Sequence, residues 1–250
     1  MRSLLYETAR EIPADKRIII NLDADEAISS NLLTSTEWNT ILQLPEGSIF
    51  RMPWVNLKPN IFNYSYGNMI GVGFVDDGKS NLTGSVMHMG RVPWPNYDIK
   101  IMQCAELKLL HFAFVNLDRN NSKRRWYQAY EKVGKSEFGP HIIRKYHGGT
   151  NRSIPVLLEV KPSWFSGYQN LGIDVTSVHY GYDYSHDYRM LEYFDTLGTD
   201  YFKMCNIWDK NWVQFATGKK DTPEKFKDPR NKLEKLIFRY SRLNENKNSI

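Results

Sequence analysis

Residues 17–26 read Arg17-Ile18-Ile19-Ile20-Asn21-Leu22-Asp23-Ala24-Asp25-Glu26, a β-branched apolar run that ends in three carboxylates. An uninterrupted run of this kind is typical of a strand that lies buried in a parallel sheet. In open α/β sheets, ligands bind beyond the carboxyl ends of the strands. The segment therefore predicts Asp23 and Asp25 at a sheet edge, where a divalent cation and a diphosphate could meet.

Size and composition set the broad class. The chain has 250 residues, enough to bury a core as one large domain or two small ones, and its net charge is +5. That charge favours an anionic ligand such as a nucleotide diphosphate and is compatible with weak contact to a membrane surface. It is too small an excess to indicate nucleic acid by itself, so no nucleic-acid partner is expected.

The cysteines and the apolar runs bear on the compartment. Cys104 and Cys205 lie far apart and form neither a metal-ligand spacing nor a disulfide framework. No export signal is recognisable, and no apolar run is long enough to span a bilayer. We therefore expect a protein of the cytoplasm, including the inner face of a membrane.

Helical and extended patterns alternate along the chain, which predicts an α/β fold: a mixed, mainly parallel sheet flanked by helices, with a helical C-terminal extension. The pattern Thr34-Ser35-Thr36-Glu37 is a capping box that opens a helix, and Pro53 marks an edge strand or a bulge. Residues 216–229 have the composition of a linker. The expected elements are a helix ending at Arg10, a strand to Leu22, a helix from 34 to 45, strands at 48–57, 69–75 and 107–117, and helices at 122–133, at 188–197 and from Asp228 onward.

Asp23 and Asp25 are the first candidate ligands. Mg²⁺ and Mn²⁺ prefer oxygen ligands, and Mg²⁺ is usually held by one or two carboxylates, with substrate phosphates and water completing its shell. Such a metal would neutralise a diphosphate leaving group as a Lewis acid. The other reading of a lone Asp-X-Asp is a solvated turn.

Histidine supplies the second candidates. His111 is embedded in the apolar strand pattern, and His88 lies in a loop-like stretch close to Arg91. A lone histidine on an apolar strand is more often a core residue with satisfied nitrogens than a ligand. Either imidazole could also complete a metal shell or donate to a phosphate.

The remaining candidates are carboxylates that could act as a base and cations that could hold phosphate. A sugar transfer with inversion needs one carboxylate to take the proton of the acceptor hydroxyl. Asp77 lies in a turn and Asp118 directly follows the His111 strand, and each could equally be a solvated acid. Lys123 opens the run Lys123-Arg124-Arg125, which is either a solvated helix face or a phosphate clamp. Asp76 and Glu106 are further base candidates.

Several stretches between Glu7 and Trp212 together resemble a bacterial and viral branch of the family 2 glycosyltransferases, by their order and spacing. They are Asp23-Ala24-Asp25-Glu26, Val75-Asp76-Asp77-Gly78, His88-Met89-Gly90-Arg91-Val92-Pro93, Leu110-His111-Phe112-Ala113-Phe114-Val115-Asn116, Lys123-Arg124-Arg125-Trp126-Tyr127-Gln128 with Glu131, Trp164-Phe165-Ser166-Gly167-Tyr168 with Gly172-Ile173-Asp174, and Ile207-Trp208-Asp209.

The resemblance implies a GT-A fold and an inverting transfer, assisted by Mn²⁺ or Mg²⁺, from a nucleotide-sugar donor to a glycan or glycoconjugate acceptor, as in polysaccharide biosynthesis. Asp23 and Asp25 match the motif that holds the metal and the diphosphate. His111 falls where related enzymes often place a histidine near the diphosphate, so it is expected within metal or phosphate reach of the two aspartates.

The chain departs from the family at its beginning. Members usually carry several strands before the acidic motif, and those strands bind the base and ribose of the donor. We therefore expect an incomplete GT-A-like domain at residues 1–135, an extension packed on it at 136–215 and a basic helical tail at 216–250. An upstream start codon, a split or degraded gene, or a partner chain that supplies the missing half would account for this departure, and an open flank is expected beside Ile18, Ile19 and Ile20.

Two other function classes stay open at this stage. The chain could be a non-catalytic remnant or accessory protein that binds glycans, or a basic α/β protein that binds an anionic surface or nucleic acid. The last reading would require a basic stripe with exposed aromatic residues on one face, and the sequence shows only scattered charges.

Overall fold

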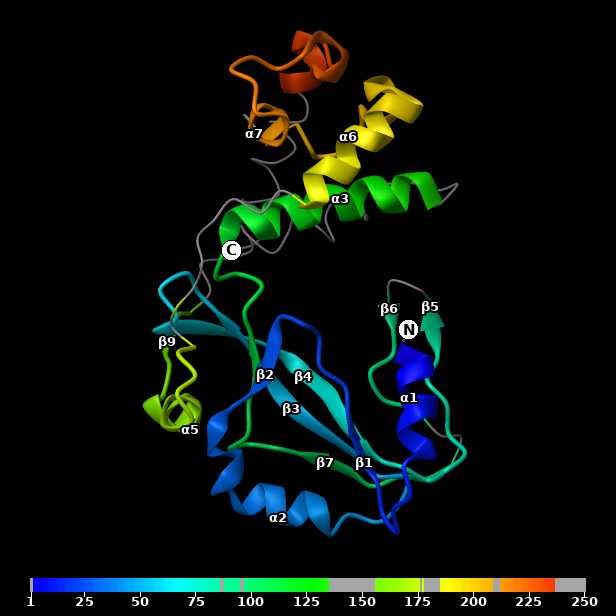
Figure 1. Cartoon of the computed structure of the whole chain (residues 1–250), viewed down its shortest axis with the longest axis vertical. Helices are drawn as coiled ribbons and strands as arrows, with labels where there is room; N and C mark the ends of the chain where they lie inside the picture. The colour runs from blue at the N-terminus through cyan, green and yellow to red at the C-terminus, as the bar shows by residue number, and fades with distance from the viewer. Residues whose placement is uncertain are drawn as a thin grey trace. The chain divides into compact units, whose positions relative to one another are not determined.

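The computed structural model describes residues 2–85, 88–94, 97–134, 156–175, 177, 185–208 and 212–236. The chain divides into two compact units, residues 1–115 with 157–178 and residues 116–156 with 179–250. The first unit carries the sheet, and the second carries the long helix α3 and the helices that follow residue 184 (Figure 1). The boundaries expected at residues 135 and 215 stay predictions, because compact units need not coincide with domains.

The first unit is built on a mixed sheet flanked by helices, which confirms the α/β class. Its strand order is β1 (Ile18–Ile20), β4 (Asn63–Val75), β3 (Ile49–Leu57), β8 (Leu109–His111) and β2 (Glu26–Ile28). Two further strands extend it: β7 (Ile101–Gln103) pairs with β3, and β9 (Leu158–Glu159) pairs with β4.

The expectation of a mainly parallel sheet is wrong for the strands that the structure describes. Only β7 and β8 run parallel to their partner β3, whereas the β1–β4, β2–β8, β3–β4 and β4–β9 pairs are antiparallel. The short connection between β3 and β4 explains the central pair, since a tight turn can join only antiparallel neighbours.

The burial of β1 explains why its β-branched run was wrongly interpreted as a parallel strand. Ile19 packs in a cluster with Tyr6 and Phe74, whereas Ile18 and Ile20 pack against the cluster that contains Phe50. Alternate residues of a strand point to opposite faces, so both faces are covered here. An all-apolar run follows from that double burial, although β1 is antiparallel to β4 and stands at one end of the strand order. Among the described residues no strand pairs with its other edge, which is where an open flank was expected.

The β3–β4 pair forms the centre of the sheet. The register shifts between Pro53 and Val55, so Pro53 marks a bulge in a central strand rather than an edge strand. Gly73 lies beside the Phe50 ring, and a Cβ atom there would fall 1.9 Å from that ring. The ring and Gly73 thus fill one site together, and no larger residue fits at position 73.

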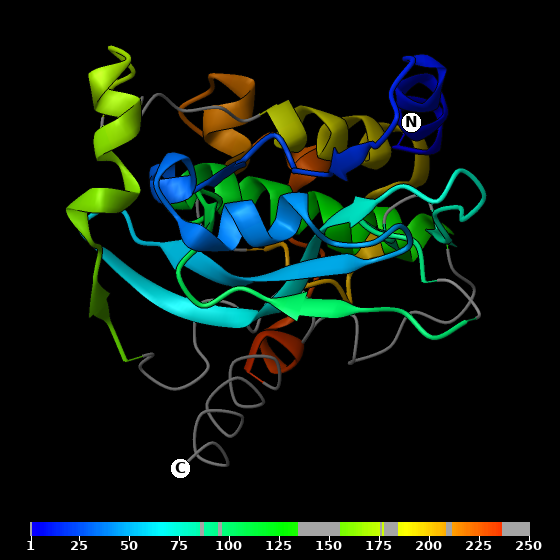
Figure 2. The same cartoon turned by 90° about the horizontal axis from the view of Figure 1, so that it is seen from below.

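Two helices cover this sheet. Their ribbons, α1 (Arg2–Glu11) and α2 (Thr36–Leu42), can be followed in Figure 2. Helix α1 buries Tyr6, and α2 buries Ile41 among side chains of β3 and β4. The predicted start of α2 is confirmed, with Ser35 as the N-cap that accepts from the Glu37 N–H at 3.1 Å.

Glu37 does not close the capping box. Its carboxylate instead accepts the backbone N–H groups of residues 105–107. Burial alone would raise the pKa of Glu37, and these three donors hold it below its ordinary value. The side chain therefore ties the loop before β8 to α2.

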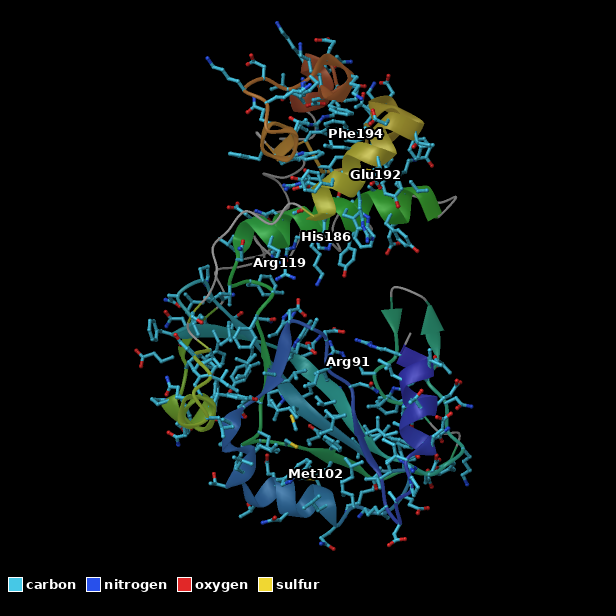
Figure 3. The ribbon with its side chains drawn as sticks, viewed as in Figure 1. Arg91, Met102, Arg119, His186, Glu192 and Phe194 are labelled. Atoms are coloured by element: carbon cyan, nitrogen blue, oxygen red, sulfur yellow. The ribbon has the colours of Figure 1, made fainter. Side chains whose placement is uncertain are left out.

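The second unit is helical. Helix α3 (Leu117–Gly134) and α6 (Ser185–Leu197) are joined by a buried ion pair in which the Arg125 guanidinium donates to both oxygens of Asp187, at 2.8 and 2.7 Å. Phe194 of α6, labelled in Figure 3, packs against a ring of aromatic side chains. They are Phe202, Trp208, Trp212 of α7 (Trp212–Thr217) and Phe226.

The helices predicted at 122–133 and 188–197 are confirmed, and each begins earlier than expected. Three other expectations fail. The strand expected at 107–117 is confined to β8 (Leu109–His111), and α3 begins at Leu117. The segment 216–229 is no linker, because Ala216 and Phe226 are buried in the second unit's core. The last helix begins at residue 232 rather than at Asp228, after reciprocal bonds between Asn231 and Glu234, and residues 237–250 lie outside the described part.

Candidate functional site

The acidic segment lies in a turn between β1 and β2. The Glu26 N–H donates to the Asp23 carbonyl at 3.0 Å, and β2 begins at Glu26. Strand β2 pairs with β8 so that Glu26 faces His111 in the register. The Phe112 N–H continues this pairing by donating to the Asp25 carbonyl at 2.8 Å. This pairing, rather than the end of a parallel strand, brings the acidic segment to His111.

Asp25 and His111 face each other. The distance from His111 Nε2 to Asp25 Oδ2 is 3.8 Å, and the imidazole is buried whereas the Asp25 side chain is 24% exposed. His111 Nδ1 lies 2.7 Å from Asn56 Oδ1. Because an amide oxygen only accepts hydrogen bonds, Nδ1 carries a proton and donates it to Asn56. In the neutral ring, Nε2 then presents a lone pair toward the carboxylate, an arrangement that a proton or a cation between the two would stabilise.

Aromatic rings surround the imidazole. Trp54 stacks on His111 with ring centroids 4.4 Å apart, and Phe114 meets its edge at 5.7 Å. The Trp54 indole N–H donates to Glu26 Oε1 at 3.0 Å. Trp54 therefore fixes the plane of the imidazole and is itself held by the strand that follows the acidic segment.

Arginines neutralise the other two carboxylates of the segment. Arg91, labelled in Figure 3, donates to the fully buried Glu26 carboxylate and, at 2.6 Å, to Asp23 Oδ2. Arg2 of α1 donates to Asp23 Oδ1. Both oxygens of Asp23 are thus bonded to guanidinium groups, and Asp23 differs from Asp25 although one residue separates them.

These contacts bear on the expected Mn²⁺ or Mg²⁺. The described residues contain no group of three or more His, Cys, Asp or Glu side chains placed to hold a metal ion. The pair Asp25 and His111 is a suitable two-donor set, since a metal-bound histidine donates its other ring N–H just as His111 donates to Asn56. Phosphate and water would have to supply the remaining positions. Asp23 does not fit this role while two arginines bind its oxygens.

The base candidate Asp77 lies at the opposite end of β1. The Asp76 N–H donates to the Arg17 carbonyl before β1, and the Asn21 N–H donates to the Val72 carbonyl after it. A strand rises about 3.3 Å per residue, so Arg17 and Asn21 are about 13 Å apart. Asp77 and the acidic segment are therefore separated by the length of the strand.

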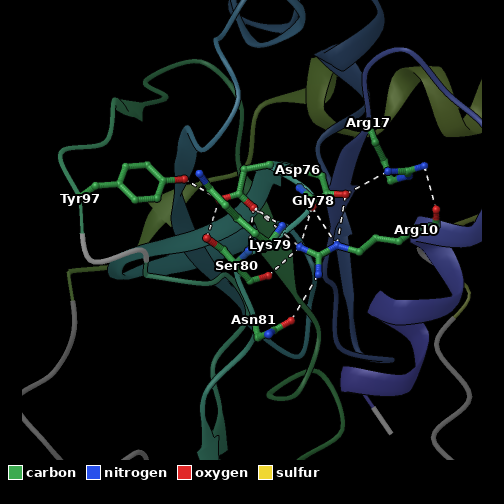
Figure 4. Close-up of polar contacts among 9 residues, drawn as sticks. Arg10, Arg17, Asp76, Gly78, Lys79, Ser80, Asn81 and Tyr97 are labelled. Atoms are coloured by element: carbon green, nitrogen blue, oxygen red, sulfur yellow. Dashed lines mark hydrogen bonds and ion pairs between the residues drawn. The ribbon is translucent and has the colours of Figure 1, made fainter.

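The turn at Asp76 and Asp77 is also tightly bonded (Figure 4). Asp77 accepts from the Ser80 hydroxyl, the Tyr97 hydroxyl and two backbone N–H groups. Burial alone would raise the pKa of Asp77, and these donors hold it well below its usual range. A carboxylate with so low a pKa is a weak proton acceptor, so the structure argues against Asp77 as the base.

Asp118 and Lys123 belong to the second unit. Asp118 is exposed in the first turn of α3, and the Lys123 ammonium lies 5.7 Å from the centroid of the Tyr127 ring. Arg125, from the same basic run, is committed to Asp187. The roles of Asp118 as base and of Lys123 toward the diphosphate stay predictions. Glu106 of the first unit accepts from the Ser35 hydroxyl, and the His88 side chain lies outside the described part.

Sequence reasoning missed Trp54 and Asn56. They are alternate residues of β3, and their relation to His111 arises only from the parallel β3–β8 register, in which Asn56 faces His111. A polar residue within an otherwise apolar strand pattern was the one signal available.

The burial of the two cysteines argues against reactive thiols. Cys104 and Cys205 are buried free cysteines in different units, and burial raises the pKa of each thiol to about 12. Both are therefore protonated at neutral pH.

Comparison of the chain with protein-family models, with curated proteins and with solved structures finds no significant match. Within the part of the chain that the structure describes, no helix is long and apolar enough to cross a membrane.

Proposed function

We propose that the chain is a glycosyltransferase that moves a sugar from a nucleotide-sugar donor to a glycan or glycoconjugate acceptor, with Asp25 and His111 at its diphosphate site. The observation that carries the proposal is the Asp25–His111 pair, held by the β2–β8 register and oriented by Asn56 and Trp54. It adds to the resemblance in sequence, which rests on separate stretches of the chain.

The chemistry assigned to each side chain follows from its contacts. His111, with Nδ1 bonded to Asn56, would ligate a cation through the Nε2 lone pair or, with a proton on Nε2, donate to a phosphate oxygen. Asp25 supplies the carboxylate on the other side of that position. Bound Mn²⁺ or Mg²⁺, held by Asp25 and His111, would neutralise the diphosphate as it leaves. Trp54 keeps the imidazole in place.

The test is a transfer and hydrolysis assay of the full chain with a panel of nucleotide-sugars. We expect Mn²⁺-dependent turnover that falls about a hundredfold or more in Asp25→Asn and in His111→Gln. Asp98→Asn is the matched control, because Asp98 is an exposed carboxylate of the same unit. Turnover that is equal in wild type and both site variants would remove the proposal.

One observation favours a second candidate, a non-catalytic protein that binds nucleotide or glycan. Arg2 and Arg91 bind both oxygens of Asp23, so the acidic motif is partly neutralised by the protein itself. Nucleoside diphosphate binding that depends on Asp25, without turnover of any donor in the panel, would favour this candidate over the enzyme.

A further inference from the structure

Lys58 is held at a defined place at the end of β3. Its N–H donates to the Asn63 carbonyl at 2.9 Å, and its carbonyl accepts the Ile61 N–H at 2.8 Å. The Asn60 side chain accepts the N–H groups of Phe62 and Asn63, which closes the turn to β4. The backbone of Lys58 is therefore fixed by bonds on both sides.

The same turn carries backbone strain. Ile61 has a φ of 61°, a left-handed conformation that a β-branched residue rarely adopts. It is nevertheless buried in the core with Val55 and Leu57. Such a conformation is costly and persists only where the surroundings impose it. The turn that presents Lys58 is thus determined by packing as well as by hydrogen bonds.

The Lys58 ammonium differs from the other cations near the acidic segment. Arg2 and Arg91 are bonded to carboxylates, whereas no described carboxylate lies within ion-pair distance of Lys58. Its Nζ lies 5.4 Å from the centroid of the Phe114 ring, and burial lowers the pKa of this ammonium. A partly desolvated cation without a carboxylate is costly, and an arriving anion would recover that cost.

Phe114 links this cation to the candidate site. The Lys58 ammonium and the His111 ring both lie within 6 Å of the centroid of Phe114, at 5.4 and 5.7 Å. His111 in turn faces Asp25 at 3.8 Å. We propose that Lys58 binds a phosphate oxygen of the ligand that His111 and Asp25 hold, so that the ammonium and the Asp25–His111 pair contact one diphosphate next to Phe114. The identity of the ligand rests on the proposed function.

The experiment measures binding rather than turnover, with inorganic pyrophosphate in the presence of Mg²⁺ as the probe and isothermal titration of the full chain as the method. We expect Lys58→Met to weaken pyrophosphate binding about tenfold or more, the loss of one charge-assisted contact. Lys58→Arg should retain the affinity within about threefold, because the charge remains. Lys100→Met is the matched control, since Lys100 is an exposed lysine of the same unit. Lys58→Gln replaces the methionine variant if the latter does not fold.

The outcomes separate this inference from the proposed function. Equal affinity in wild type and Lys58→Met would overturn it and leave only a cation–π contact with Phe114, even if nucleotide-sugar turnover depends on His111. Absence of pyrophosphate binding by the wild-type chain would overturn it as well. Pyrophosphate binding that depends on Lys58, in a chain without turnover, would support the phosphate site and contradict the enzyme.

Discussion

Two acidic segments lie at opposite ends of β1: the turn with Asp76 and Asp77, which follows β4, and the segment from Asp23 to Glu26. They differ in the contacts that their carboxylates make. At the start of β1, Asp76 accepts from Arg10 and Arg17, and its side chain is 1% exposed. At its end, Asp23 also accepts from two arginines, but its side chain is 43% exposed, and Asp25 faces an imidazole. The comparison teaches that burial and the fixed donors around each carboxylate, not the motif that contains it, distinguish an acid that stabilises the fold from one that is open to a ligand.

The comparison is tested most severely at Asp76. Asp76→Asn removes the charge that two guanidinium groups share, and with it the link between α1 and the turn after β4. Breaking a buried ion pair costs about 3–5 kcal/mol. Arg10 and Arg17 keep about one-fifth of their side chains exposed, so we expect a loss of about 2–3 kcal/mol in the free energy of unfolding. Amide hydrogen exchange in β1 and β4 measures it locally.

The matched control for Asp76 is Asp98→Asn, an exposed carboxylate of the same unit that should change the exchange by less than about 0.5 kcal/mol. Equal protection of β1 and β4 in Asp76→Asn and wild type would show that the arginine contacts do not stabilise this end of the sheet.

Asp77 sharpens the comparison through pH. Its pKa is depressed in the folded chain, so the stability that it contributes is fully present above the ordinary aspartate pKa of about 3.9 and is lost as pH falls through the folded value. We expect Asp77→Asn to cost about 1–2 kcal/mol at pH 7, by the loss of its charge-assisted hydrogen bonds. The difference from wild type should shrink steadily between pH 4 and pH 2 in urea unfolding. A difference that stays constant over that interval contradicts the role given to the charge.

The sequence predicted elements whose signals are local. The Ser35 cap of α2, the turn after Val75 and the helix of residues 188–197 each follow from residues within one or two turns. The direction of β1 could not be read in this way. A β-branched run indicates a strand that is buried on both faces. In β1 this burial comes from α1, α2 and the neighbouring strands, although the strand is antiparallel.

The candidate site, like the fold, could be predicted from the sequence only in part. The proximity of His111 to Asp25 was expected from the resemblance, and the structure places them 3.8 Å apart. The stacking of Trp54, the bond to Asn56 and the arginines on Asp23 depend on registers between distant segments, which periodicity does not encode. The spacing of the acidic residues likewise did not distinguish Asp77 from the other candidate bases, because spacing carries no information on how many donors surround a carboxylate.

Asp25 should behave in the opposite way to Asp76. We expect Asp25→Asn to change the free energy of unfolding by less than about 1 kcal/mol, because the side chain is partly exposed and faces an imidazole at 3.8 Å rather than two arginines. The same variant should lose the metal-dependent thermal shift that a nucleoside diphosphate gives the wild type. A stability loss as large as that of Asp76→Asn would place Asp25 among the structural acids.

Asp23 supplies the smallest effect and the finest test. Its side chain is 43% exposed and its two arginine contacts are surface ion pairs, which contribute about 0.2–1 kcal/mol each at most. Arg91 keeps its bonds to the buried Glu26 carboxylate when Asp23 is changed, so no buried charge loses its partner. We therefore expect Asp23→Asn to cost about 0.5 kcal/mol in urea unfolding, and less at 1 M salt, where exposed pairs are screened within about 3 Å. If Asp23 is instead a metal ligand in the bound state, Asp23→Asn should weaken Mn²⁺ binding in the presence of nucleoside diphosphate as strongly as Asp25→Asn does. Equal losses would mean that Arg2 and Arg91 release Asp23 when the ligand arrives, and a loss confined to Asp25→Asn would show that the two aspartates of the motif have separate tasks.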